Sequence, residues 1–475
     1  MYIGGNGQSD TPPGSDQEEY TLALAVSQGA GVAAAVLWNV PNEKCEFPGE
    51  RPVPTRRTED GIIAYTWRQF LDGGGERPEW LLQLPMTKSV VRAMDTLEAF
   101  LPAKLGGASD ADSGMSFLLS GASKRGWITW LASATDPKQR VIGLAPVVLD
   151  FLNLHTVMHR MWRAYGDWSF AFVDYWSLNI TRDLDTELMP TLMAIVDPYT
   201  YRARLTQPKL VINAGGDEFF QVDDSRSWWD QMPDPKIRLM VANAEHSMAT
   251  GLPTVVPSIT VFARAVMLGD SSGLAAIDTA HVDGRTNNPN AMPARVAAPR
   301  AALAMPVAAL ATAAKAAVTA SNADVTSGTP APLPQLSWSI DDAAGEINVT
   351  LAEGYATPSK VMVRYADTAD DKRRDWRLAI KQEPCPTIEI FGGCVRALLW
   401  GKSSQAVVQT GDRQWTAHMG PPEGGGWRAF FVELQFESGA GGGEALLTAT
   451  SEVAVTPNTW PFDDCKGTEC QGELV

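Results

Sequence analysis

The chain has 475 residues, of which 45% are hydrophobic and 20% are charged, and its formal net charge is −16. At roughly 100 to 200 residues per domain, this length predicts two domains and a linker, and the composition is that of a folded globular protein. The negative charge disfavours binding to nucleic acid and to anionic membrane surfaces, because both would repel the chain at long range. The sequence has no apolar run of about 18 residues, so no membrane-spanning helix is expected.

The two ends of the chain bear on its cellular location. Residues 1–7 are typical of a strand that enters a glycine turn and lack the features of a signal peptide, so we expect upstream residues to be missing. Cys385 with Cys394 and Cys465 with Cys470 are close enough in sequence to form two local disulfides, although unpaired thiols are the alternative. Disulfides would favour an extracellular or secretory-pathway location over a cytoplasmic one.

Strand and helix patterns alternate over the first 283 residues. Runs typical of buried strands occupy 31–38, 115–120, 141–149, 209–213 and 237–242. Residues 59–71 are typical of the start of a long helix, and over residues 86–100 apolar side chains recur every three or four positions. This alternation predicts an α/β fold with a doubly wound, mostly parallel sheet over residues 1–283.

Three further segments complete the predicted organisation. Residues 151–204 are rich in aromatic side chains and too long for a simple crossover, so we expect a helical cap over the active site, with a plain packing helix pair as the alternative. Residues 284–334 are rich in Ala and Pro and predict a linker. Residues 335–475 contain alternating strand patterns, as at 336–340 and 361–365, and predict a small β-sandwich of immunoglobulin or fibronectin type.

Three polar residues in chain order suggest a hydrolase triad. Ser123 follows an apolar run and is flanked by Gly121 and Gly126, small residues of the kind that a strained nucleophile turn requires. The pattern is stretched to G-x-S-x-x-G, and taken alone Ser123 could also be an ordinary helix N-cap. Asp217 and His246 each follow a predicted strand, so the order Ser, Asp, His is that of α/β-hydrolases.

Other residues compete for two of these roles. Asp150 is the main alternative for the triad acid, because it ends a predicted strand, and further acidic candidates are Glu218, Asp223 and Asp224. The remaining histidines are expected to be structural or to lie on the surface, and they are His155, His159, His281 and His418. No cysteine has a C-x-x-C spacing, so we expect neither a metal site nor a cofactor.

The backbone around Ser123 predicts the oxyanion hole. One N–H group would come from Lys124, and the other from the turn that contains Gly5 and Asn6.

Lys124 and Arg125 are unusual in a first helical turn, because cations there oppose the helix dipole. We expect Arg125 to pair with a carboxylate such as Glu218 or Asp150, and the alternative is attraction of an anionic substrate group.

Four segments carry a resemblance to a known family. They are residues 121–127, 197–199, 216–220 and 373–377. The chain resembles the PhoPQ-activated pathogenicity-related protein family over nearly its whole length, a family that includes a secreted autocrine repressor of cell proliferation in amoebae. The resemblance implies an α/β-hydrolase domain followed by a small β domain, usually exported. Gln221-Val222, and Val241-Ala242-Asn243 before the histidine, depart from the family's tendency to carry proline at these places.

Two functions from different classes are consistent with these patterns. The leading hypothesis is a serine hydrolase that cleaves an ester or amide bond of a small molecule or peptide through an acyl-enzyme on Ser123, with His246 as base and Asp217 as its orienting acid. The alternative is a secreted signalling protein that keeps the fold but acts by binding a partner, for example a cell-surface protein.

Overall fold

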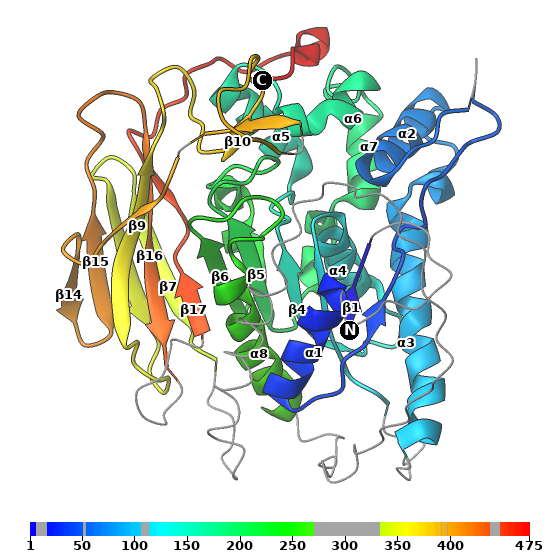
Figure 1. Ribbon diagram of the computed structural model, residues 1–475, viewed down its shortest axis with the longest axis horizontal. Helices are drawn as coiled ribbons and strands as arrows, with labels where there is room; N and C mark the ends of the chain where they lie inside the picture. Colours follow the sequence, from blue (N-terminus) through cyan, green and yellow to red (C-terminus); the bar gives the residue numbers. More distant parts are fainter. Residues whose placement is uncertain are drawn as a thin grey trace.

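The computed structural model describes residues 1–5, 17–50, 54–105, 114–269, 333–390, 392–396, 398–437 and 447–475. Its centre is a sheet of six parallel strands (Figure 1). In spatial order the strands are β2 (Val36–Leu37), β1 (Tyr2–Ile3), β3 (Phe117–Ala122), β4 (Val141–Val147), β5 (Lys209–Ala214) and β6 (Lys236–Val241). Both faces of the sheet are covered, which explains why its longer strands are nearly continuous apolar runs. The expected doubly wound parallel sheet is confirmed.

Helices lie on both faces of this sheet. They are α1 (Glu18–Ala30), α2 (Glu59–Asp72), α3 (Gln83–Leu105), α4 (Lys124–Thr135) and α8 (Leu252–Gly269), with short 3₁₀ turns η1 (Pro78–Trp80), η4 (Asp224–Ser227) and η5 (Trp229–Gln231). The side chains of β3 alternate between the faces: Phe117 and Leu119 belong to the apolar cluster that contains α3 and α4, whereas Leu118 belongs to the cluster that contains α8. No helix among the described residues is long and apolar enough to span a bilayer.

The segment between β4 and β5 is helical, as predicted for residues 151–204. It comprises α5 (Leu154–Tyr165), η2 (Phe170–Phe172), α6 (Val173–Ser177), α7 (Met189–Val196) and η3 (Pro198–Arg204). Trp168, Phe172 and Tyr175 are buried in the large apolar cluster, so these aromatic side chains build the interior of the segment. The C-terminal tail is joined to it, since the indole of Trp168 donates to the Cys470 carbonyl at 2.7 Å.

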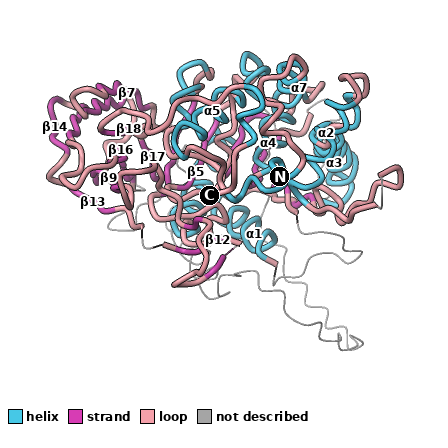
Figure 2. Tube along the Cα trace, turned by 90° about the horizontal axis from the view of Figure 1, so that it is seen from above, coloured by secondary structure: helices cyan, strands magenta, loops and turns pink. Residues whose placement is uncertain are grey.

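The C-terminal region is a β-sandwich with two antiparallel sheets. One sheet contains β13 (Gly401–Ser403), β9 (Lys360–Asp367), β16 (Arg428–Phe436), β17 (Leu447–Thr450) and β18 (Ala454–Thr456). The other contains β14 (Val407–Gly411), β15 (Gln414–His418), β8 (Glu346–Leu351) and β7 (Leu336–Asp341). A small third sheet joins β10 (Ala379–Ile380), β12 (Gly393–Val395) and β11 (Glu389–Ile390), and the turn η6 (Gly467–Gln471) lies near the end of the chain. Seen from above, the sandwich lies at one side of the helical part (Figure 2).

The sandwich packs directly against the edge of the parallel sheet. Thr450 of β17 accepts the Met240 N–H of β6 at 3.0 Å, and Ser258 of α8 accepts the Thr448 N–H at 3.2 Å. Apolar residues of β6, α8 and the sandwich belong to one buried cluster. The two parts therefore share a core.

Several expectations from the sequence have a definite outcome in the structure. The pairs Cys385–Cys394 and Cys465–Cys470 are disulfides, and Cys45 is a free thiol. The strand expected over 31–38 was wrong in extent, because only Val36–Leu37 forms a strand. Helix α1, which was not predicted, precedes this strand and ends at Ala30, and its C-cap residue Gly31 has a φ of 70°. Most of the predicted linker, residues 284–332, and His281 lie outside the described residues.

Candidate active site

Ser123 stands at a sharp turn between strand β3 and helix α4. Its backbone has φ 57° and ψ −127°, a conformation that a residue with a side chain adopts only under strain. The turn is held in place because the Ser123 N–H donates to the Val147 carbonyl at 2.8 Å. The side chain of Ser123 does not cap the helix, so the interpretation as an ordinary helix N-cap does not apply. The geometry is that of a nucleophile elbow.

The two glycines explain how the stretched G-x-S-x-x-G pattern builds this turn. A Cβ on Gly121 would lie 2.8 Å from the Cβ of Arg125, and a Cβ on Gly126 would lie 2.9 Å from the Val147 carbonyl oxygen. In the usual pattern the second glycine stands where this chain has Arg125. Because Gly121 has no side chain, the side chain of Arg125 fits at that position, and Gly126 allows α4 to approach β4. The departure from G-x-S-x-G leaves the elbow intact.

The three predicted residues lie within hydrogen-bond distance of one another. His246 Nε2 is 2.8 Å from Ser123 Oγ, and His246 Nδ1 is 2.9 Å from Asp217 Oδ1 and 3.0 Å from Oδ2. Asp217 Oδ1 also accepts the backbone N–H groups of Phe219 at 2.8 Å and Phe220 at 3.2 Å. These bonds fix the carboxylate, and the carboxylate in turn fixes the imidazole with Nε2 toward the serine.

The surroundings of His246 favour its protonated form. Burial lowers the pKa of the imidazole, but the charge of Asp217 and its hydrogen bond outweigh burial and raise the pKa above its usual value. The rings of Phe219 and Phe220 lie with centroids 4.4 and 5.6 Å from the imidazole. An apolar wall beside the imidazole strengthens its interaction with Asp217.

The competing acids are engaged elsewhere. Asp150 accepts from the Asn213 amide at 2.5 Å and from the Trp228 indole at 2.7 Å. Asp223 accepts from Arg374 at 2.6 Å, and Asp224 accepts the Gln221 backbone N–H.

Glu218 lies near the imidazole but is not its acid partner. Its carboxylate accepts the backbone N–H of His246 at 3.0 Å, so it supports the histidine loop. Burial, followed by the charge of Asp217, raises the pKa of Glu218 to about 7.

The cations after Ser123 are paired, but with partners other than those expected. Arg125 donates to both carboxylate oxygens of Glu59, at 2.8 and 2.5 Å, and Lys124 lies 2.6 Å from Glu59 and 2.9 Å from Asp60. The expected pairing of Arg125 with Glu218 or Asp150 was therefore wrong. Burial opposes the charge on Lys124, but Asp60 and Glu59 outweigh it and raise the pKa of the ammonium. These two acids begin α2, where the helix dipole stabilises negative charge.

The predicted oxyanion donors lie beside the elbow as far as the structure describes them. Strand β1 pairs with β3, with Ile3 opposite Gly121, so Gly5 follows the strand end next to the nucleophile turn. A Cβ on Gly5 would lie 2.1 Å from the Arg125 guanidinium, so any other residue there would displace the end of that side chain. Lys124 opens α4, where first-turn N–H groups have no carbonyl partner within the helix. Asn6 lies outside the described residues.

The C-terminal region braces the two loops that carry Asp217 and His246. The side chain of Asn243 accepts the Trp400 N–H at 2.7 Å and donates to the Trp400 carbonyl at 3.2 Å. The Trp400 indole donates to the Gly215 carbonyl at 3.0 Å, and the Leu378 N–H donates to the Gly216 carbonyl at 2.9 Å. Sequence reasoning missed these contacts, because the partners are more than a hundred residues apart.

The 373–377 motif has a related structural role. Arg377 pairs with Asp375 at 2.9 Å and donates to the Ser169 hydroxyl at 3.0 Å. That hydroxyl donates to the Glu218 carbonyl at 2.6 Å. The motif thus connects the C-terminal region to the residue that follows Asp217.

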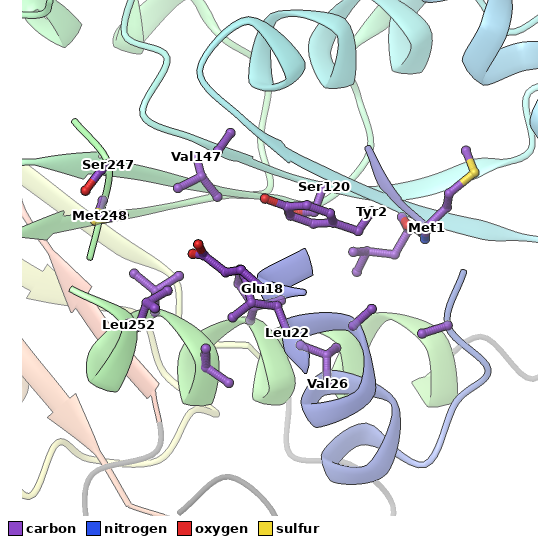
Figure 3. Close-up of a pocket in the computed structure, with 17 residues that line it drawn as sticks. Met1, Tyr2, Glu18, Leu22, Val26, Ser120, Val147, Ser247, Met248 and Leu252 are labelled. Atoms are coloured by element: carbon purple, nitrogen blue, oxygen red, sulfur yellow. Dashed lines mark hydrogen bonds between the residues drawn. The ribbon is translucent and has the colours of Figure 1, made fainter. Parts of the chain in front are cut away.

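A cavity of about 130 Å³ lies on the face of the sheet that α1 and α8 cover (Figure 3). Its wall is mainly apolar, with Leu22, Val26 and Leu252 among its side chains. Ala122 and Ser247 line it, but their neighbours Ser123 and His246 do not. The lining of the cavity therefore does not include Ser123 or His246.

Comparison with solved structures finds partial likenesses to esterases. The acetyl xylan esterase from Paenibacillus sp. R4 is 14% identical with a TM-score of 0.32, and the match covers 52% of this chain and 68% of that one. Est1E from Butyrivibrio proteoclasticus is 12% identical with a TM-score of 0.30, and the match covers 56% of this chain and 86% of that one. Likenesses this weak say nothing about the reaction of this chain.

Sequence comparison is more informative. Autocrine proliferation repressor protein A from Dictyostelium discoideum is 31% identical over 98% of this chain and 78% of its own length. The family model described as PhoPQ-activated pathogenicity-related protein matches residues 1–287. The resemblance carried by the four motifs is confirmed, and the chain belongs to the PhoPQ-activated pathogenicity-related protein family.

Proposed function

We propose that this protein is a serine hydrolase that cleaves an ester or amide bond through an acyl-enzyme on Ser123. The observation that carries the proposal is the chain of contacts from Ser123 Oγ through His246 to Asp217, with distances of 2.8 and 2.9 Å. The strained backbone of Ser123 adds support, because residues held in such conformations cluster at active sites.

In the proposed reaction, Ser123 Oγ forms a bond to the acyl carbon while His246 Nε2 takes its proton. Asp217 stabilises the imidazolium, and the tetrahedral oxyanion accepts hydrogen bonds from the Lys124 N–H and from the turn at Gly5. The intermediate collapses as the bond to the leaving group breaks and His246 returns the proton to that group. Water activated by the same imidazole then releases the acid and restores the serine. No cofactor or metal takes part in these steps.

A fluorophosphonate probe tests the nucleophile without knowledge of the substrate. Ser123 Oγ would displace fluoride and form a stable phosphonate ester, which mass spectrometry of the digested protein locates. Ser123→Ala should abolish labelling, whereas Ser404→Ala, at an exposed serine of the C-terminal region, should leave it unchanged. A screen of p-nitrophenyl esters and peptide p-nitroanilides would then define the bond cleaved. Folded wild-type protein that takes up no label at Ser123 would refute the proposal.

The name of the amoebal relative favours a second candidate function. That protein is called a proliferation repressor, so this chain could act as a secreted signal by binding a partner, such as a protein on the cell surface. The two disulfides support export, because such bonds persist in oxidising compartments. A folded Ser123→Ala/His246→Ala protein added to cells separates the two functions: a retained effect on growth supports binding, and a lost effect supports catalysis.

A further inference from the structure

A second cluster of polar side chains lies apart from the triad, where the C-terminal tail meets the helical segment. His155 and His159 are on α5, Asp185 lies between α6 and α7, and Asp464 belongs to the tail. The two histidines are four residues apart on one helix, so both rings point to the same side. None of these residues contributes to the triad.

Three of the atoms form a nearly equilateral triangle. His155 Nε2 and His159 Nε2 are 3.2 Å apart, and Asp185 Oδ1 lies 3.2 Å from the first and 3.1 Å from the second. A tetrahedral ion with bonds of about 2.0–2.2 Å holds its ligand atoms roughly 3.3–3.6 Å apart. The triangle is therefore nearly the size that one such ion requires.

All three atoms of this triangle can offer a lone pair to its centre. An imidazole nitrogen without a proton and a carboxylate oxygen are both metal ligands, and each of the three atoms lies within 3.2 Å of the other two. A cation at the centre would be shared by all three atoms through these lone pairs.

The next layer of contacts is also that of a metal site. A histidine that binds a metal usually donates its other ring N–H to a carboxylate, which is the arrangement of His159 with Asp464. The second oxygen of Asp185 accepts the Gly467 N–H at 2.9 Å, which holds the carboxylate in orientation. The side chain of His155 is 46% exposed, so an ion can reach the cluster from solvent.

We propose that His155, His159 and Asp185 bind a divalent transition-metal ion of the zinc class, with Asp464 orienting His159. Two imidazoles and one carboxylate form a ligand set that suits Zn²⁺ and leaves a position for water. Cys465, which lies next to Asp464, is not a ligand because it is paired with Cys470.

The bound ion would stabilise the attachment of the tail. Asp464 precedes the Cys465–Cys470 disulfide, and Gly467 lies in the loop that this disulfide closes. The tail continues to Gly472, whose carbonyl accepts the Trp176 indole N–H at 3.0 Å. An ion held by α5 and Asp185, and linked to the tail by these hydrogen bonds, favours the docked conformation over the detached one.

The test is Zn²⁺ and Co²⁺ binding to the full oxidised chain, produced without a histidine tag and stripped with a chelator. We expect about one Zn²⁺ per chain by elemental analysis, a visible Co²⁺ spectrum, and a Tm that rises with added Zn²⁺. His155→Ala should weaken binding by at least about a hundredfold, and Asp464→Asn by about 10- to 100-fold. His418→Ala removes an exposed histidine of β15 and serves as the matched control.

Binding that is lost in His155→Ala and in a separate Asp185→Asn variant, and kept in His418→Ala, supports the site. Because His155 is partly exposed, its variant should fold, and circular dichroism checks this. Wild-type protein that binds no Zn²⁺ at micromolar concentration would overturn the proposal. Equal binding by wild type and His155→Ala would do the same.

Discussion

Glu218 gives the sharpest test of the electrostatics around the candidate triad. It is buried beside Asp217, and its pKa is raised from an ordinary 4.5 to about 7. As the pH rises from 4.5 to 7, the unfolded chain releases this proton while the folded chain retains it, so this group makes the fold less stable. A difference of one pKa unit corresponds to about 1.36 kcal/mol. Above pH 7, the raised pKa of Glu218 therefore lowers the free energy of unfolding by about 3 kcal/mol.

Glu218→Gln removes the ionisation but keeps an oxygen that can accept the His246 N–H. We compare the free energy of unfolding of the variant with that of wild type at about pH 4 and at about pH 8. The difference, variant minus wild type, should be about 3 kcal/mol larger at pH 8 than at pH 4. Urea unfolding followed by tryptophan fluorescence at both pH values measures this difference. The matched control is Glu353→Gln, at an exposed turn after β8. A Glu218→Gln variant whose relative stability is the same at both pH values would show that the reasoning is wrong.

The same substitution has a kinetic consequence. The Glu218 charge raises the pKa of His246, so its removal should move the acidic limb of the pH profile for fluorophosphonate labelling to lower pH. A limb that moves to higher pH would contradict the assigned sign.

Three further substitutions test how the site is held together. Asp217→Asn should slow labelling by about 10³- to 10⁴-fold with little change in Tm, because it removes the charge that stabilises the imidazolium. Asn243→Ala leaves the Trp400 N–H without its 2.7 Å partner, so we expect roughly 1–3 kcal/mol less stability in urea and slower labelling. Gly121→Ala places a Cβ 2.8 Å from Arg125, which should cost about 1–3 kcal/mol and disturb the elbow, measured by the same two assays.

The parallel sheet and the meeting of Ser123, His246 and Asp217 could be predicted from sequence because their signals are local. A strand buried on both faces appears as a short apolar run, and Ser123, Asp217 and His246 each follow such a run. Parallel strands bring their carboxyl ends to one edge of the sheet, so residues far apart in the chain meet there. The same rule also admits Asp150, which follows β4, so it does not by itself choose between the two acids.

Contacts between distant polar residues could not be predicted in the same way. Nothing near Arg125 in the sequence indicates that Glu59 is its partner, because the pairing depends on where α2 begins. Strand β1 was expected from the glycine turn that follows it, whereas the extent of β2 was not, because two residues are too few to show a period. The spacing of His155 and His159 is visible in the sequence, but Asp185 is brought to them only by the fold of the helical segment.

The C-terminal region was predicted as a separate β-sandwich, yet its contacts make it part of the candidate catalytic machinery. Hydrogen bonds from Trp400 and Leu378 end on the two glycines that precede Asp217, and Asn243 joins the histidine loop to the same region. The apolar cluster that includes β6 and α8 continues into the sandwich, so removing the sandwich would expose that cluster to water. The loops that carry Asp217 and His246 follow the carboxyl ends of β5 and β6, and functional residues on such loops need a rigid scaffold to position them. In this chain that support comes from the sandwich, which gives a physical reason for both parts to occur in one polypeptide.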